Sequence, residues 1–202
     1  MTARSEILAR IRAAVAQGAT AQEIPRDYDR APLVGGGDVE RFATAVDEYR
    51  AHVHRATDVA AAVAALIADD VTAALPSGFP SGWRPDRAFI VDCEPTTLSA
   101  PELDAVDVVV TGCRLGIAAT GTIVLDAGPG QGRRALTLVP DHHICVIRAD
   151  QIVDTVPQAF AALDPRRPLT FISGPSATSD IELNRVEGVH GPRILDVIIA
   201  AP

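Results

Sequence analysis

The stretch VDVVVTGCRLGIAATGTIVL, residues 106–125, decides the fold class of this chain. It contains three short apolar runs, at 106–110, 116–119 and 122–125, separated by small and polar residues. The first run is nearly continuous rather than alternating, which is typical of a strand buried on both faces of a sheet. Runs this short, next to glycine, predict β-strands rather than helices.

Similar runs recur on both sides of this stretch. Further strands are predicted at 71–75, 88–91, 134–139, 144–147, 169–172 and 197–200. Apolar residues at helical spacing predict helices at 5–17, 39–50, 57–68 and about 154–163. Strands with helices between some of them predict an α/β domain, with a mostly parallel or mixed sheet flanked by helices.

The 202 residues suit one sizeable hydrophobic core. Residues 19–38 are rich in proline, glycine and aspartate, which indicates a linker. We therefore predict an N-terminal helix and linker over 1–38, followed by a single domain over 39–202.

Composition argues against several classes of protein. The net charge is -8 and no basic run is present, so nucleic-acid binding is not expected. No apolar run reaches the ~18 residues of a membrane span, and the first residues lack the apolar core of a signal peptide. We expect a cytoplasmic protein.

Lysine and cysteine usage narrows the chemistry. All 18 basic residues are arginine, which excludes a Schiff-base or P-loop lysine. Cys93, Cys113 and Cys145 are isolated, so the chain cannot by itself hold a four-cysteine iron–sulfur cluster. No metal site is predicted either: His142 and His143 would point to opposite faces of a strand. His52 and His54 could share one face but lack a further ligand nearby in sequence.

The segment ISGPSATSDIE, residues 172–182, is the densest cluster of polar residues after a predicted strand. Hydroxyls and glycine N–H groups could cradle a small anion beyond the end of that strand. A serine- and threonine-rich turn with Asp180 as a helix cap explains the same residues. Both interpretations stay open. The candidate residues are Ser173, Gly174, Ser176, Thr178, Asp180 and Glu182.

Three other segments contain glycine next to polar residues. His190 and Gly191 lie in the tight segment GVHGP, where the histidine is either an acid–base group or a structural residue. Thr120, Gly121 and Thr122 either face a ligand or form a bulge or hairpin. The run 128–132 lacks dinucleotide-site spacing and is predicted to be a flexible hairpin loop.

Four segments in order, 116–125, 138–144, 172–182 and 188–192, resemble the signatures of the lactate-utilization protein C family, which is built on the LUD domain. The resemblance covers about residue 106 to the C-terminus. It implies a Rossmann-like sheet similar to that of the ribose-phosphate isomerase and CoA-transferase superfamily. It also implies a role in oxidising L-lactate to pyruvate with two companion proteins that carry the iron–sulfur clusters.

The resemblance therefore implies that this chain is a non-redox subunit without a cofactor of its own. It is also compatible with a homo-oligomer. The pocket for a small anionic ligand would be formed by 120–122, 173–182 and 188–192. Two departures bear on catalysis: Ala119 stands where many relatives have glutamate, and Ala177 where arginine is common.

Two alternative functions remain. One is a stand-alone isomerase or acyl/CoA-transferase-like enzyme, with Asp180 or Glu182 as base or nucleophile and His190 as acid. The other is a non-catalytic structural or regulatory subunit, in which the same loops only dock a partner.

Overall fold

The computed structural model describes residues 3–16, 24–26, 37–175, 177–178, 186–187 and 191–201. Its α-helices are α1 (Ala3–Ala16), α2 (Val39–Glu48), α3 (Val59–Leu66), α4 (Ala100–Asp104) and α5 (Val156–Ala162). Short 3-10 turns are η1 (Ser81–Trp83), η2 (Arg134–Thr137) and η3 (Ala149–Gln151). Within the described part, no helix is long and apolar enough to cross a membrane.

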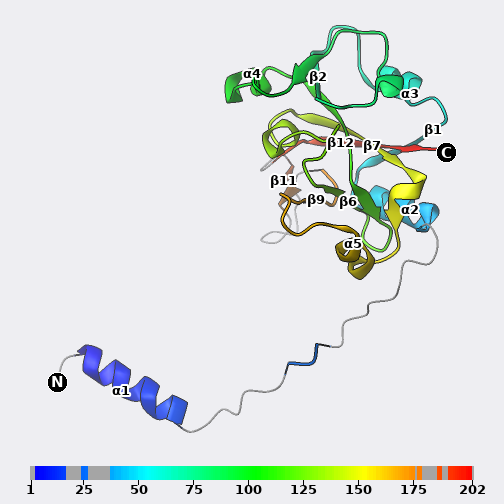
Figure 1. Cartoon of the computed structure of the whole chain (residues 1–202). Helices are drawn as coiled ribbons and strands as arrows, with labels where there is room; N and C mark the ends of the chain where they lie inside the picture. The colour runs from blue at the N-terminus through cyan, green and yellow to red at the C-terminus, as the bar shows by residue number, and fades with distance from the viewer. Residues whose placement is uncertain are drawn as a thin grey trace.

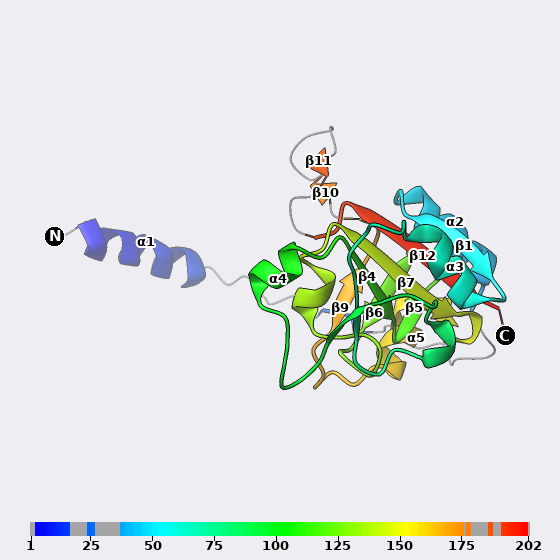
Figure 2. The same ribbon diagram turned by 90° about the horizontal axis from the view of Figure 1, so that it is seen from above.

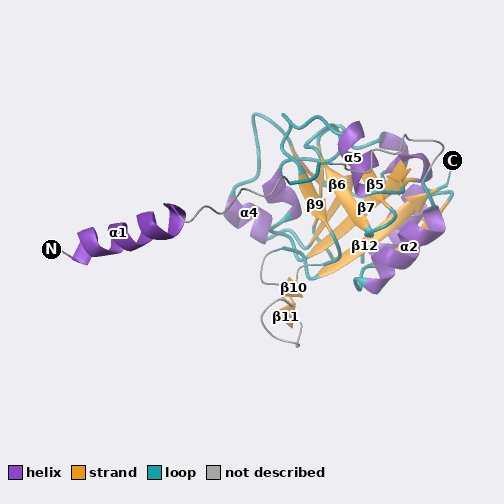
Figure 3. Cartoon of the chain, turned by 90° about the horizontal axis from the view of Figure 1, so that it is seen from below, coloured by secondary structure: helices purple, strands orange, loops and turns teal. Residues whose placement is uncertain are grey.

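The main sheet has six strands, all paired in parallel. In spatial order they are β1 (His52–Ala56), β12 (Ile194–Ala200), β7 (His142–Arg148), β4 (Val108–Gly112), β2 (Ala73–Pro76) and β3 (Ile90–Asp92). Helices lie against the sheet in Figures 1 and 3, which confirms the predicted α/β class.

A second sheet consists of β8 (Ile152–Val153), β5 (Leu115–Ile117), β6 (Thr122–Leu125) and β9 (Thr170–Ile172), in that order. It is formed by two pairs of strands: β5 and β6 lie between β4 and β7 in the chain, and β8 and β9 lie between β7 and β12. β5, β6 and β9 pair antiparallel, whereas β8 joins β5 in parallel. A separate two-stranded pair, β10 (Ala177–Thr178) with β11 (Val186–Glu187), projects from the body in Figure 2.

Strand β12 shows why several apolar runs are continuous. Val197 and Ile199 pack in the cluster that contains Phe42 of α2, whereas Ile198 packs in the cluster that contains Val63 of α3. Successive side chains of a strand point to opposite faces, so helices on both faces require apolar residues at every position.

Capping and burial differ among the helices. The Asp58 side chain accepts from the Ala61 N–H at 3.0 Å, as expected of an N-cap. Phe42 and Val46 of α2 are buried, whereas Tyr49, directly after the helix, is exposed. No side chain of α1 is buried. The division into 1–38 and 39–202 stays a prediction.

The strand predicted at 134–139 is wrong. Residues Arg134–Thr137 form a 3-10 turn, in which Leu136 N–H bonds to the Arg133 carbonyl. The backbone groups are satisfied locally, and Val139 N–H likewise bonds to the carbonyl of Ala135. The run 128–132 therefore leads into a turn rather than a strand, so it is not a hairpin loop.

Candidate functional site

A row of three hydroxyls joins two of the predicted site segments. Thr122 Oγ1 lies 2.8 Å from Thr120 Oγ1 and 2.8 Å from Ser173 Oγ. Antiparallel pairing of β6 with β9 sets Ile123 opposite Ile172, which brings the residues just beyond them together. The structure thus places Thr120, Thr122 and Ser173 in one cluster, although 51 positions separate the last two.

Two glycines bring these segments against α2 and the residue after it. A Cβ on Gly121 would lie 2.6 Å from the carbonyl carbon of Ala45, and one on Gly174 would lie 2.6 Å from the Tyr49 oxygen. Both have positive φ, +56° and +82°. The close backbone approach at Gly121 is therefore to the helix. The alternative of a hairpin glycine is confirmed, because β5 and β6 pair antiparallel around it.

Much of the rest of the predicted site lies outside the described residues: Ser176, Asp180, Glu182 and His190. Thr178 is placed by its backbone in β10, where it pairs with Val186. Gly191 has φ +126° shortly before β12. The serine-rich segment does follow a strand, β9, as expected. The roles assigned to these residues stay predictions.

A histidine–aspartate cluster is a feature that sequence reasoning missed. Asp196 of β12 accepts from His54 Nε2 at 2.5 Å and from His142 Nε2 at 2.6 Å, and His52 Nδ1 lies 3.4 Å away. β12 runs between β1 and β7, so the three strands bring these groups together. Among the described residues, no group of three or more such side chains is arranged to hold a metal ion.

Asp196 is an ionised centre for this cluster. Its side chain is only 5% exposed, and burial raises its pKa. Hydrogen bonds and positive charge from His142 and His54 outweigh burial, so the pKa of Asp196 lies below its usual value. The signal in sequence was an aspartate in the otherwise apolar run of residues 194–200, together with His-x-His in β1.

His143 points to the other face of β7, as the alternation predicts. It is fully buried, and its Nε2 lies 2.8 Å from Thr111 Oγ1. Burial, with a smaller contribution from the charge of His142, lowers the pKa of His143 to about 3. This imidazole is therefore a neutral structural group near pH 7.

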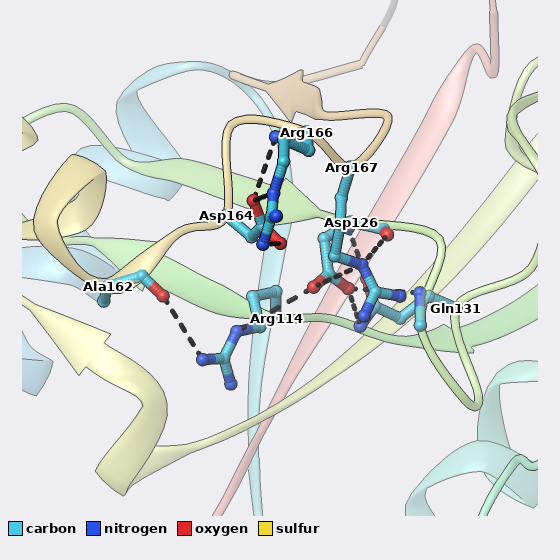
Figure 4. A network of polar contacts seen from close by, with 8 residues as sticks. Arg114, Asp126, Gln131, Ala162, Asp164, Arg166 and Arg167 are labelled. Atoms are coloured by element: carbon cyan, nitrogen blue, oxygen red, sulfur yellow. Dashed lines mark hydrogen bonds and ion pairs between the residues drawn. The ribbon is translucent and has the colours of Figure 1, made fainter.

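A second polar network surrounds Asp126, directly after β6 (Figure 4). Asp126 Oδ1 accepts from Gly128 N–H at 3.1 Å and from Gln131 Nε2 at 2.8 Å. Its Oδ2 lies 3.3 Å from Arg167 Nε and 3.9 Å from Arg114 Nε. The carboxylate is nearly buried, whereas the two arginines are about half exposed.

Comparison with known proteins shows which chains this one is similar to. The family model of the LUD domain matches residues 96–200. "Lactate utilization protein C" of Deinococcus radiodurans is 43% identical, over 98% of this chain and 95% of that protein. The protein of the same name from Halalkalibacterium halodurans is 39% identical, over 43% of this chain and 40% of its own length.

A solved structure agrees with the fold. The crystal structure of a DUF162 family protein from Deinococcus radiodurans, at 1.70 Å resolution, superposes with a TM-score of 0.67 and 39% identity. The superposition covers 81% of this chain and 95% of that one. The α/β architecture is thus shared with an experimentally determined relative.

Proposed function

Because this chain belongs to the LUD-domain family of lactate utilization protein C, we propose that it serves in the utilization of L-lactate. Its specific role is that of a non-redox subunit in a system that oxidises L-lactate to pyruvate. The family membership rests on a relative that is 43% identical over nearly the whole of both chains. The four sequence signatures in order also support this assignment.

The electrons of this oxidation are assigned to partner proteins. Conversion of lactate to pyruvate releases two electrons and two protons, which need an acceptor. The chain has three cysteines, Cys93, Cys113 and Cys145, each isolated in sequence, whereas the usual cluster takes four, which supports placing the clusters in other proteins. Iron–sulfur proteins of the same system are the proposed partners and acceptors.

The proposed ligand pocket starts from the hydroxyl row. Thr122 is nearly buried, yet its hydroxyl bonds to Thr120 and Ser173 at the junction of two signature segments. Hydroxyl groups can donate to the carboxylate of a small hydroxy acid. Ser176, Thr178 and Gly191 belong to the adjoining segments and complete the proposed binding set. Asp180, Glu182 and His190 are its proposed acid–base groups.

Growth on L-lactate tests this assignment. In a strain that lacks its own copy, Ser176→Ala combined with Asp180→Asn is expected to abolish growth on L-lactate but not on glucose. The melting temperature of the purified variant should stay within about 2 °C of the unchanged chain, because both substitutions nearly preserve the size of the side chain.

The matched control is Ser81→Ala with Asp86→Asn, two exposed residues outside the LUD match. It carries the same chemical changes and should grow normally on L-lactate. Normal growth of the Ser176 and Asp180 variant would contradict the proposed pocket.

A further inference from the structure

The main sheet has one point at which its strand order reverses. After β2 the chain continues to β3 on one side, then returns through α4 to β4 on the other side. In open parallel sheets, ligands bind outside the carboxyl ends of the strands at such a point. Here this position lies beyond Pro76 of β2 and Gly112 of β4.

The turn at residues 128–132 occupies this position. Gly130 N–H donates to the Ser77 carbonyl at 2.9 Å, and the Gly130 carbonyl accepts from Gly112 N–H at 2.7 Å. Hydrogen bonds thus join this turn to Ser77, directly after β2, and to Gly112, the last residue of β4. Beside it remains a hollow of about 340 Å³, whose walls include Arg114, Asp126, Gln131, Asp164 and Arg167.

The charged side chains in and beside this hollow carry an excess of positive charge. Asp164 is held by the neighbouring Arg166, whose Nε and Nη2 donate to its two oxygens at 3.1 Å. Asp126 is the remaining carboxylate, and it faces both Arg114 and Arg167. With Arg166 counted, three guanidinium groups face the two carboxylates of Asp126 and Asp164, so this group of described residues carries one positive charge in excess.

Arg114 Nη2 donates to the Ala162 carbonyl at 3.3 Å (Figure 4), so the donors left for a ligand among the described residues are other guanidinium N–H groups rather than backbone N–H groups. Gly128 N–H is bonded to Asp126, Gly130 N–H to Ser77, and Gln131 N–H to the Gly128 carbonyl. A phosphate cradle of successive free N–H groups is therefore not available in this turn. Within the described residues, Arg167 bonds through Nε, to the Asp126 carbonyl at 3.0 Å. Its two terminal nitrogens, which form the fork that suits a carboxylate, have no such contact.

From this arrangement we infer that the hollow binds a small monocarboxylate, held between Arg114 and Arg167 at the carboxyl end of β4. One negative charge neutralises the excess positive charge. The two guanidinium groups supply directed hydrogen bonds to the carboxylate oxygens. Asp126 is a positioning residue, because it holds both arginines at the rim through one buried carboxylate.

This site is separate from the hydroxyl row. Arg114 and Asp126 lie at the open end of the β5–β6 hairpin, whereas Thr120 and Thr122 lie at its turn. The two sites also lie at opposite ends of β9, because Arg167 precedes this strand and Ser173 follows it. The inference therefore does not depend on the proposed function, and variants can separate the two sites.

Titration calorimetry of the whole purified chain with sodium L-lactate tests the inference. Arg167→Lys keeps a positive charge beside Asp126 but removes the planar fork, so affinity at this site should fall about tenfold. Arg166→Lys is the matched control and should bind as the unchanged chain does, since its guanidinium is committed to Asp164. Unchanged circular dichroism spectra should show that all variants fold.

The same titration in a Thr122→Val, Ser173→Ala background distinguishes the two pockets. The Arg167-dependent binding should persist there. The inference is overturned if no saturable binding occurs in the unchanged chain. It is also overturned if Arg167→Lys binds as tightly as Arg166→Lys, or if inorganic phosphate displaces lactate more effectively than acetate does. Binding lost only with Thr122 and Ser173 would instead support the hydroxyl pocket.

Discussion

Acidification from pH 7 to pH 5 is expected to lower the free energy of unfolding by about 2 kcal/mol through His143 alone. Burial holds the pKa of this imidazole at about 3 in the folded chain, against an ordinary value of 6.5. The unfolded chain therefore binds a proton first. The stabilisation is complete above pH 6.5 and is lost progressively as the pH falls toward 3.

Denaturant unfolding at the two pH values measures this loss. His143→Gln removes the titrating group and should shrink the difference between pH 7 and pH 5 by about 2 kcal/mol, although it weakens the bond to Thr111 at both. His52→Gln is the control, because this exposed histidine should leave the His143 contribution intact. An unchanged pH dependence in the His143 variant would show that the buried imidazole does not cause the loss of stability between pH 7 and pH 5.

Substitution of Gly121 by alanine is expected to destabilise the chain by roughly 2–5 kcal/mol. A positive φ costs a residue with a Cβ about 1–2 kcal/mol. The new methyl group would also lie 2.6 Å from the backbone of Ala45, which must shift, and overpacking of this kind typically costs about 1–3 kcal/mol. The hydroxyl row beside it would be displaced at the same time.

Gly82→Ala is the matched control for this substitution. Its added Cβ would have no atom within 4 Å, so its effect should stay within about 0.5 kcal/mol. Thermal or denaturant unfolding of the two variants in parallel makes the comparison. If both glycine variants unfold alike, the hairpin is not packed against α2 as described.

Local sequence patterns predicted the elements whose structure depends on local residues. The run 122–125 was placed at its observed bounds, because an apolar β-branched run lies between Gly121 and Asp126. The run 134–139 has a similar composition, but its backbone closes in a local turn that composition does not reveal. Strand β1 was not predicted, since three of its five residues are histidine or arginine.

The clusters of charged residues could not be predicted for a different reason. His54 and Asp196 are 142 positions apart and meet only because β1 pairs with β12. Arg167 Nε donates to the Asp126 carbonyl, although 41 positions separate the two residues. Asp126 follows β6 and Arg167 precedes β9, and these two strands pair in the second sheet. Such contacts depend on strand order and register, which a single sequence does not specify. The hydroxyl row was predicted as two separate segments, and its closure again required the pairing of β6 with β9.

We propose that this chain is an essential non-redox subunit of L-lactate oxidation. L-lactate-dependent reduction of an electron-acceptor dye tests this role, by the purified chain alone and then with the proposed iron–sulfur partner proteins. We predict no activity for the chain alone, activity in the full mixture, and loss of that activity when this chain is omitted. Full activity without this chain, or no lactate oxidation with every component present, would rule out this role. Turnover of a sugar phosphate or CoA ester by the chain alone would then favour the isomerase or acyl-transfer alternative.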